Sequence, residues 1–277
     1  MVCDDRVEDF LRGVESASWS CLLLDYDGTL SPFSANRDQA LPYPGVVEIL
    51  QSIVDAGRTR LVIVTGRDAH EVGPLLGLSP APEVWGVHGL QRLRPDGTCE
   101  LLEIPPVVSR ALGDARQWLS YQGLEDLIEV KPGSLAVHWR NFGESAASEL
   151  RSRILLGWFH IVERDSLKLQ EFDGGVEMRM ADLDKGNVVR AILEEVGPDV
   201  PVAYLGDDTS DESAFRALRQ RGLTALVRPR PRRTAAQVWM KAPEGILHFL
   251  SRWQAMTEAA GKAQGAASLL GSHHANR

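Results

Sequence analysis

The chain has 277 residues, of which 44% are hydrophobic and 25% are charged. This size and composition indicate a globular protein with one large domain or two modest ones, and they disfavour general disorder. The formal net charge is −8 and the pI is near 5.4. Because phosphate backbones recruit basic surfaces, this charge argues against nucleic acid as a partner, although a few local cations would suffice for a small anion.

The cysteines and the start of the chain indicate the compartment. The chain has three cysteines, Cys3, Cys21 and Cys99, and so small and odd a number does not indicate a disulfide framework. Residues 1–12 mix acids and bases without an apolar stretch, and no run is long enough to cross a bilayer. We therefore expect a cytoplasmic protein without a membrane partner. No long heptad or apolar surface stripe argues for assembly, so we expect a monomer.

The first third of the chain alternates short apolar runs with amphipathic segments. The runs at 19–24, 61–64 and 84–87 predict buried strands. The segments 44–55 and 68–76 predict helices, and Pro44 suits the first turn of its helix. The same alternation returns late, with helices expected at 185–196, 213–220 and 243–254 and strands at 200–205 and 223–227. Continuous apolar strands between helices are typical of a parallel, doubly wound sheet.

The middle of the chain has a different pattern. After Pro105-Pro106 it predicts helices at 108–121 and 145–156 and strands near 127–131, 135–140, 158–163, 167–172 and 176–180. The connections are too short for crossovers, so antiparallel pairing is expected. We predict an α/β fold in which residues 1–106 and 181–260 form a Rossmann-like core and residues 107–180 form an inserted α/β cap. The tail 261–277, rich in Ala, Gly and Ser, is expected to be flexible.

Polar loops follow the predicted core strands at their carboxyl ends, where open parallel sheets bind ligands. The first loop is Asp25-Tyr26-Asp27-Gly28-Thr29. One of its two carboxylates can attack as a nucleophile while the other carries the proton to and from the leaving group. Taken alone, the motif is also compatible with a strand-end turn that has acidic capping residues.

Two further loops supply complementary chemistry. In Thr65-Gly66-Arg67, the hydroxyl can donate to a phosphate oxygen and the next helix start supports an anion, although a simple N-cap is the alternative. Residues 206–212 carry four acids just after a strand, which indicates a hard cation with oxygen ligands. An acidic helix start, favoured by the helix dipole, is the alternative.

Lys185 lies at a predicted helix start, where the helix dipole disfavours a cation. Such a placement is expected if the ammonium neutralises a phosphate and the attacking carboxylate, whereas a solvated surface lysine is the alternative. The order of nucleophile loop, hydroxyl loop, lysine and acidic loop resembles the haloacid dehalogenase superfamily of phosphohydrolases. The insertion before Lys185 is where that superfamily's second class of cap is found.

A closer resemblance is to the trehalose 6-phosphate phosphatases, and it covers residues 20 to 255. The runs that carry it are 24–32, 64–67, 86–90, 129–140, 176–179 and 206–215. Tyr26 between two acids and the doubled Asp207-Asp208 are more specific than the superfamily pattern.

This resemblance implies a site and a substrate class. Asp25 would form an aspartyl-phosphate, Asp27 would be the general acid and then the base, and Thr65 and Lys185 would hold phosphoryl oxygens. Mg²⁺ would be the cofactor, and a sugar phosphate would be the small-molecule substrate. The implied metal ligands are Asp25, Asp27 through its backbone carbonyl, and Asp207, with Asp208 or Asp211 ligating or orienting from behind. The implied substrate-binding residues are Gly66, Arg67, His88, Gly89, Glu129, Lys131, Arg140 and Glu177.

The predicted cap strands carry charges at alternate positions. Glu129 shares one strand face with Lys131, and His138 shares one with Arg140, which suits the recognition of sugar hydroxyls. A solvated sheet face is the alternative. The chain departs from the family pattern at Gln91, where Glu is common, at Gly174-Gly175, where a lysine is common, and at Met180, where proline is usual. Because of these departures, other sugar phosphates remain alternative substrates.

Several functions are compatible with these motifs. The first is hydrolysis of trehalose 6-phosphate through an aspartyl-phosphate with Mg²⁺. The second is the same chemistry on a related disaccharide or pseudo-disaccharide phosphate, and a phosphomutase is not formally excluded. A third function is a non-catalytic sugar-phosphate-binding module, although such domains usually lose the first aspartate or the lysine.

Overall fold

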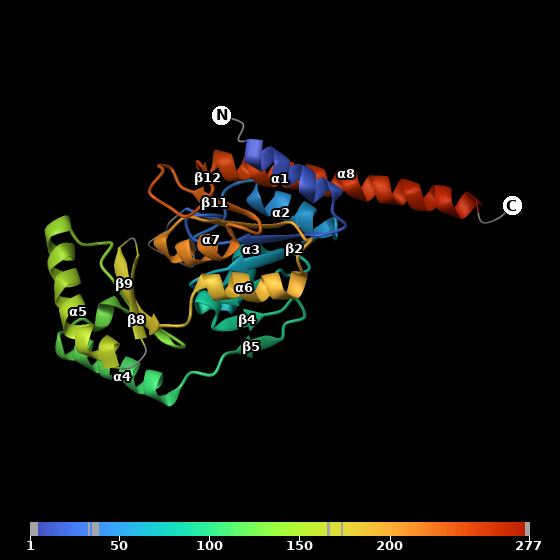
Figure 1. The fold of residues 1–277 in the computed structure, drawn as a ribbon. Helices are drawn as coiled ribbons and strands as arrows, with labels where there is room; N and C mark the ends of the chain where they lie inside the picture. The colour runs from blue at the N-terminus through green and yellow to red at the C-terminus, as the bar shows by residue number, and fades with distance from the viewer. Residues whose placement is uncertain (1–4, 33, 35–38, 165–166, 173, 275–277) are drawn as a thin grey trace.

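The protein is folded into two units that lie side by side (Figure 1). The structure is a computed structural model, and it describes residues 5–32, 34, 39–164, 167–172 and 174–274. The larger unit is the core, built on an eight-stranded sheet. The smaller unit, residues 106–180, is built on a separate four-stranded sheet and is called the cap below.

The core sheet has the strand order β12-β11-β10-β1-β2-β3-β4-β5. Its six parallel strands are β1 (Ser20–Leu24), β2 (Thr59–Val64), β3 (Glu83–Gly86), β10 (Val202–Gly206), β11 (Leu223–Val227) and β12 (Val238–Met240). The antiparallel strands β4 (Gln91–Leu93) and β5 (Cys99–Leu101) form one edge. The predicted doubly wound sheet is therefore confirmed, with an antiparallel extension at one side.

Both faces of this sheet are covered by helices. Leu22 and Leu24 of β1 pack into a cluster with α1 (Asp5–Ser16), α2 (Val46–Asp55), α3 (Ala69–Leu76) and α8 (Glu244–His274). Cys21 and Leu23 point the other way, into a cluster with α6 (Lys185–Val196) and α7 (Glu212–Leu218). Alternate residues of a strand face opposite sides, so a strand buried on both faces is apolar along most of its length, as β1 is from Cys21 to Leu24.

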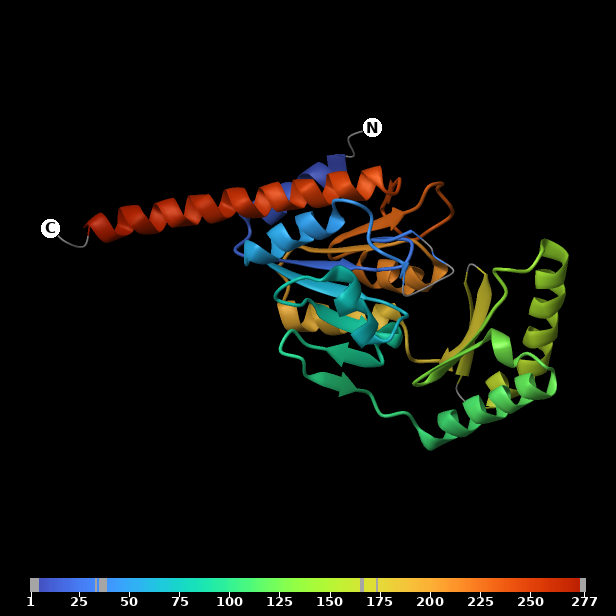
Figure 2. The ribbon, with the colours of Figure 1, turned by 180° about the vertical axis from the view of Figure 1, so that it is seen from behind.

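The cap sheet is antiparallel, with the order β6-β7-β9-β8. Its strands are β6 (Ile128–Lys131), β7 (Ser134–His138), β8 (Leu167–Phe172) and β9 (Gly175–Met180). Helices α4 (Pro106–Tyr121) and α5 (Glu144–Arg164) cover one face, where Leu135 and Val137 are buried against Ile154. The other face is turned toward the core (Figure 2).

The predicted strand near 158–163 is wrong, because α5 continues to Arg164. Leu150, Ile154 and Trp158 recur every four residues and are buried on one helix face, so the apolar run is the end of a helical stripe.

The last helix was predicted to end at residue 254, but α8 reaches His274 and includes most of the tail expected to be flexible. That segment is rich in alanine, the strongest helix former, which explains the continuation. The distal part of α8 projects away from the core (Figure 1). No helix in the described chain, α8 included, has both the length and the hydropathy of a membrane span.

Candidate active site

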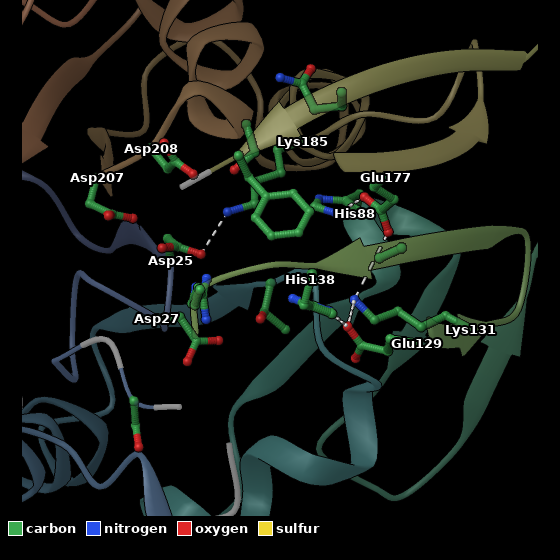
Figure 3. Close-up of a pocket in the computed structure, with 18 residues that line it drawn as sticks. Asp25, Asp27, His88, Glu129, Lys131, His138, Glu177, Lys185, Asp207 and Asp208 are labelled. Atoms are coloured by element: carbon green, nitrogen blue, oxygen red, sulfur yellow. Dashed lines mark hydrogen bonds and ion pairs between the residues drawn. The ribbon is translucent and has the colours of Figure 1, made fainter. Parts of the chain in front are cut away.

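The carboxyl ends of β1, β2 and β10 open into a cleft between core and cap (Figure 3). The predicted site residues that line it are Asp25, Asp27, Thr65, Gly66, His88, Glu129, Lys131, Arg140, Glu177, Lys185, Asp207 and Asp208. The cleft therefore brings together the four chemical motifs of the core and the charged strands of the cap.

Asp25 lies at the centre of the core side of the cleft. It follows β1 directly, and its N–H donates to the carbonyl of Leu205 in the neighbouring strand. Its carboxylate is buried, and it accepts hydrogen bonds from Lys185 Nζ at 2.6 Å and from the Thr29 hydroxyl at 3.1 Å. Burial raises the pKa of Asp25 to about 7, against the opposing effect of Lys185.

Lys185 is a buried cation at the first residue of α6. Asp184 caps this helix by accepting from the N–H of Asn187. The Lys185 ammonium donates to Asp25 and, at 2.7 Å, to Asp211. Burial alone would lower the pKa of Lys185, but the two carboxylates hold it above its usual value. The ammonium therefore stays charged next to Asp25, and the surface-lysine alternative is wrong.

Three buried carboxylates form a candidate metal centre. Asp25, Asp207 and Asp211 each offer an oxygen, and these oxygens lie within 4.8 Å of one another. Burial and the charge of Asp25 raise the pKa of Asp207 well above its ordinary value. One ammonium cannot balance three carboxylates, so the cluster could hold a metal ion, and an all-oxygen donor set suits a hard divalent cation.

Asp211 also organises the acidic loop. Its Oδ1 accepts from Lys185 and from the hydroxyl of Tyr204, and its Oδ2 accepts from the backbone N–H groups of Asp207 and Asp208 at 3.0 Å each. A Cβ at Gly206 would lie 2.4 Å from Asp211 Cγ, so only glycine fits there. Asp208 is not in the three-carboxylate cluster, and its Oδ1 lies 3.9 Å from Arg228.

Arg67, predicted to bind substrate, contacts Asp27 and is not among the cleft-lining residues. Its Nε and Nη2 donate to the two carboxylate oxygens at 2.7 and 2.6 Å. The guanidinium is buried and lies over the ring of Tyr26, whereas Asp27 reaches the cleft. Arg67 therefore fixes the direction of the Asp27 carboxylate. Gly89 is likewise not among the cleft-lining residues, and a Cβ there would lie 2.7 Å from Val188 of α6.

The cap side of the cleft is a network of charges (Figure 3). Glu129 lies 2.8 Å from His138 Nε2 and 3.5 Å from Lys131 Nζ. Glu177 accepts from the Ser134 hydroxyl at 2.8 Å and lies 3.9 Å from Lys131. These carboxylates and the ammonium line the cleft, so this wall of the cleft is polar and charged.

His88 joins the core to the cap. It lies in a short 3₁₀ helix (Val87–Gly89), and its Nε2 is 2.9 Å from Glu177. Its backbone φ is +57°, a left-handed conformation that is uncommon outside glycine. A Cβ at Gly66 would lie 2.9 Å from the imidazole, so the hydroxyl loop also packs against this ring.

We expect His88→Asn to reduce the loss of stability in mild acid. Burial lowers the pKa of His88 from 6.5 to about 4, so below about pH 6.5 the unfolded chain takes up a proton that the folded chain refuses. Stability should therefore fall as the pH drops through this window, by roughly 1–2 kcal/mol at about pH 5. Asparagine tolerates positive φ and does not titrate. Urea unfolding of both proteins between about pH 7 and pH 5 measures the difference, and parallel curves would contradict the burial of a neutral imidazole.

Several residues in the cleft were not predicted as site residues. They are Ser34, Ala136, Gln170, Phe172 and Ser210. Strand β8 contained a usable signal, because Leu167 and Leu169 alternate with Lys168, Gln170 and Phe172. The leucines pack under the sheet, which leaves the other three on the cleft side.

The trehalose-phosphatase family model matches residues 23–238. The chain belongs to the trehalose-phosphatase family. It is 32% identical over 247 residues to a trehalose-phosphate phosphatase of Mycobacterium marinum, a match that covers 83% of this chain and 60% of that protein. The chain thus spans about 60% of the length of the curated relatives it matches.

Solved structures support the family's fold. The C-terminal domain of trehalose-6-phosphate phosphatase from Candida albicans superposes with a TM-score of 0.78 at 18% identity, and the match covers 90% of this chain and 96% of that one. A haloacid dehalogenase-like hydrolase from Bacillus subtilis gives a TM-score of 0.60 at 14% identity, over 84% and 99% of the two chains. The trehalose-phosphatase fold of this chain is therefore that of the haloacid dehalogenase superfamily.

Proposed function

We propose that this trehalose-phosphatase family member hydrolyses trehalose 6-phosphate to trehalose and phosphate through an aspartyl-phosphate on Asp25. One observation carries the proposal: a buried carboxylate held by Lys185 faces a cleft whose opposite wall is the polar network of the cap. The core side supplies groups for a phosphate, and the cap side supplies groups for hydroxyls.

The first step transfers the phosphoryl group to the protein. A carboxylate oxygen of Asp25 forms a bond to phosphorus while the bond from phosphorus to the sugar oxygen breaks. Asp27 gives its proton to that oxygen, so the sugar leaves as an alcohol. Lys185 and Thr65, both buried at the edge of the cleft, stabilise the charge on the phosphoryl oxygens.

The second step releases phosphate. Asp27, now a carboxylate held by Arg67, removes a proton from water. The water oxygen bonds to phosphorus, and the bond to Asp25 breaks to restore the free carboxylate. The cap excludes bulk water while this intermediate exists, and it must open to release the sugar.

Mg²⁺ is the proposed cofactor, and the donor set fits it. Asp25 and Asp207 would hold the ion, with Asp211 setting the direction of the loop that carries Asp207. When bound, Mg²⁺ would offset the repulsion between the substrate dianion and the nearby carboxylates.

Steady-state phosphate release from trehalose 6-phosphate and glucose 6-phosphate, each with and without Mg²⁺, tests the proposal. We expect a kcat/KM at least about 100-fold higher for the disaccharide phosphate and a loss of about 1,000-fold or more after chelation. Equal rates on both sugars would overturn the substrate assignment. Full activity in chelator would overturn the cofactor assignment.

Arg67→Lys should impair the general acid selectively. Lysine cannot donate to both oxygens of Asp27 in the fixed fork that Arg67 provides. We expect kcat/KM for trehalose 6-phosphate to fall about 10- to 100-fold. For p-nitrophenyl phosphate it should fall less than about threefold, because that leaving group departs without a proton.

Arg92→Lys is the matched control for this variant. Arg92 is also buried and donates to both oxygens of a carboxylate, Glu195, but it is not among the cleft-lining residues. Its replacement should leave the ratio of the two kcat/KM values unchanged. Equal losses on both substrates in Arg67→Lys would contradict the role given to Arg67.

A further inference from the structure

An aromatic ring interrupts the polar wall of the cap. Phe172 is the last residue of β8, and its ring lines the cleft. The ring is 5.4 Å from the imidazole of His138 and 5.9 Å from the guanidinium carbon of Arg140, measured between ring centroids and from centroid to carbon. Three side chains of the cleft thus meet at one point of the cap, with a single apolar face among them.

The glycine pair Gly174–Gly175 makes this arrangement possible. Phe172 is paired with Gly175 across β8 and β9, and a Cβ on Gly175 would lie 2.2 Å from Phe172 Cζ. A Cβ on Gly174 would lie 2.1 Å from Arg140 Cγ, and Gly174 also has a φ of +86°. Any side chain at either glycine would therefore displace the ring or the arginine from its present place.

The chemistry of a sugar explains why an apolar face belongs here. A pyranose carries hydroxyls around its rim, and its C–H bonds form an apolar face. Carboxylates and ammonium groups such as Glu129 and Lys131 can bind the rim. These charged groups make no favourable contact with the apolar face, whereas an aromatic ring packs against that face and removes it from water.

We propose that Phe172, seated on Gly175, is the platform on which the sugar part of the substrate stacks, and that the glycine pair Gly174–Gly175 is a specificity determinant of this chain. This inference rests on the proposed function and assigns to Phe172 a direct contact with the sugar. Phe172 belongs to the cap, whereas the groups for the phosphate belong to the core. The platform therefore acts on binding of the sugar and leaves the chemical step unchanged.

Phe172→Leu tests the platform directly. Leucine keeps the position apolar but removes the flat ring. We expect KM for trehalose 6-phosphate to rise about 5- to 10-fold with kcat changed less than about twofold. The kinetics of p-nitrophenyl phosphate, which has no sugar, should stay within about twofold of the wild type. Phe159→Leu is the matched control, because Phe159 is half exposed on α5 and is not a cleft-lining residue.

Gly175→Ala provides a second, independent variant. It should raise the same KM by at least as much as Phe172→Leu, because the new methyl meets both the ring and, at 2.6 Å, the backbone oxygen of Val137. Gly143→Ala is its control, since a Cβ at Gly143 meets no atom within 4 Å. The double variant Phe172→Leu/Gly175→Ala should be no worse than Gly175→Ala alone, because both changes remove one contact.

The outcomes separate this inference from the proposed function. An unchanged KM for trehalose 6-phosphate in Phe172→Leu overturns the platform, and so does an equal loss on p-nitrophenyl phosphate. A wild-type protein that hydrolyses p-nitrophenyl phosphate but not trehalose 6-phosphate overturns the proposed function instead. In that case the sugar phosphate that is hydrolysed should still show the Phe172→Leu effect on KM.

Discussion

Asp25→Asn is expected to lower phosphate release to below about one-thousandth of the wild-type rate on every substrate. An amide nitrogen and a neutral amide oxygen cannot form the acyl-phosphate. The assay is phosphate release over long incubations with trehalose 6-phosphate and with p-nitrophenyl phosphate, so that loss of chemistry is distinguished from loss of sugar binding.

The same variant should remain folded. Asparagine has the size of aspartate, and its introduction removes one of three close, buried carboxylates. We expect its thermal midpoint without Mg²⁺ to be no lower than that of the wild type, because repulsion is relieved while Lys185 keeps its contact with Asp211. Asp199→Asn, at an exposed site, is the control for both measurements. Retained turnover in Asp25→Asn would show that another group is the nucleophile.

Lys185→Met should damage both activity and stability. Methionine fills much of the same volume but removes the ammonium that contacts Asp25 and Asp211. Breaking a buried ion pair by removing one partner typically costs about 3–5 kcal/mol, because the remaining charge is left unpaired. Activity should fall by about 1,000-fold or more, since an oxyanion-stabilising charge next to the nucleophile is lost as well.

Urea unfolding with and without Mg²⁺ separates the two effects of Lys185→Met. Mg²⁺ should stabilise the variant more than the wild type, because a divalent cation restores positive charge among the carboxylates. Activity should stay low in Mg²⁺, since the ion does not replace the ammonium on the phosphoryl group. Lys241→Met, at an exposed site, is the control. An unchanged free energy of unfolding in Lys185→Met would contradict the buried contacts of the ammonium.

Positions where two sequence signals coincide could be predicted from sequence. The apolar run before Asp25 predicts a buried strand, and the polar residues after it indicate the edge of the sheet at which the site lies. Helix α1 was not predicted, because its buried residues Leu11 and Val14 are surrounded by charges. Strands β4, β5 and β12 have three residues each, which is too short for a periodic pattern.

Contacts between distant side chains could not be predicted. Thr65-Gly66-Arg67 was correctly expected at a strand end, but nothing in its spacing shows that Arg67 turns back onto Asp27 of the adjacent loop. The same is true of Asp211, whose four hydrogen bonds come from a lysine, a tyrosine and two backbone groups. Local spacing predicts the element, but long-range packing decides which atoms a long side chain meets.

The short link between β9 and α6 has a consequence for exchanging modules between relatives. The chain leaves the last cap strand at Met180 and reaches Lys185 after Ala181–Asp184 alone. If a cap from a relative is grafted at this boundary, the junction must still place the Lys185 ammonium beside Asp25. An insertion in the link would disturb the cap that Asp184 provides at the start of α6, next to that charge, whereas no residue of the opposite link, 102–105, lines the cleft. Exchange of caps should therefore tolerate a change of length in the link before α4 but not in the link between β9 and α6.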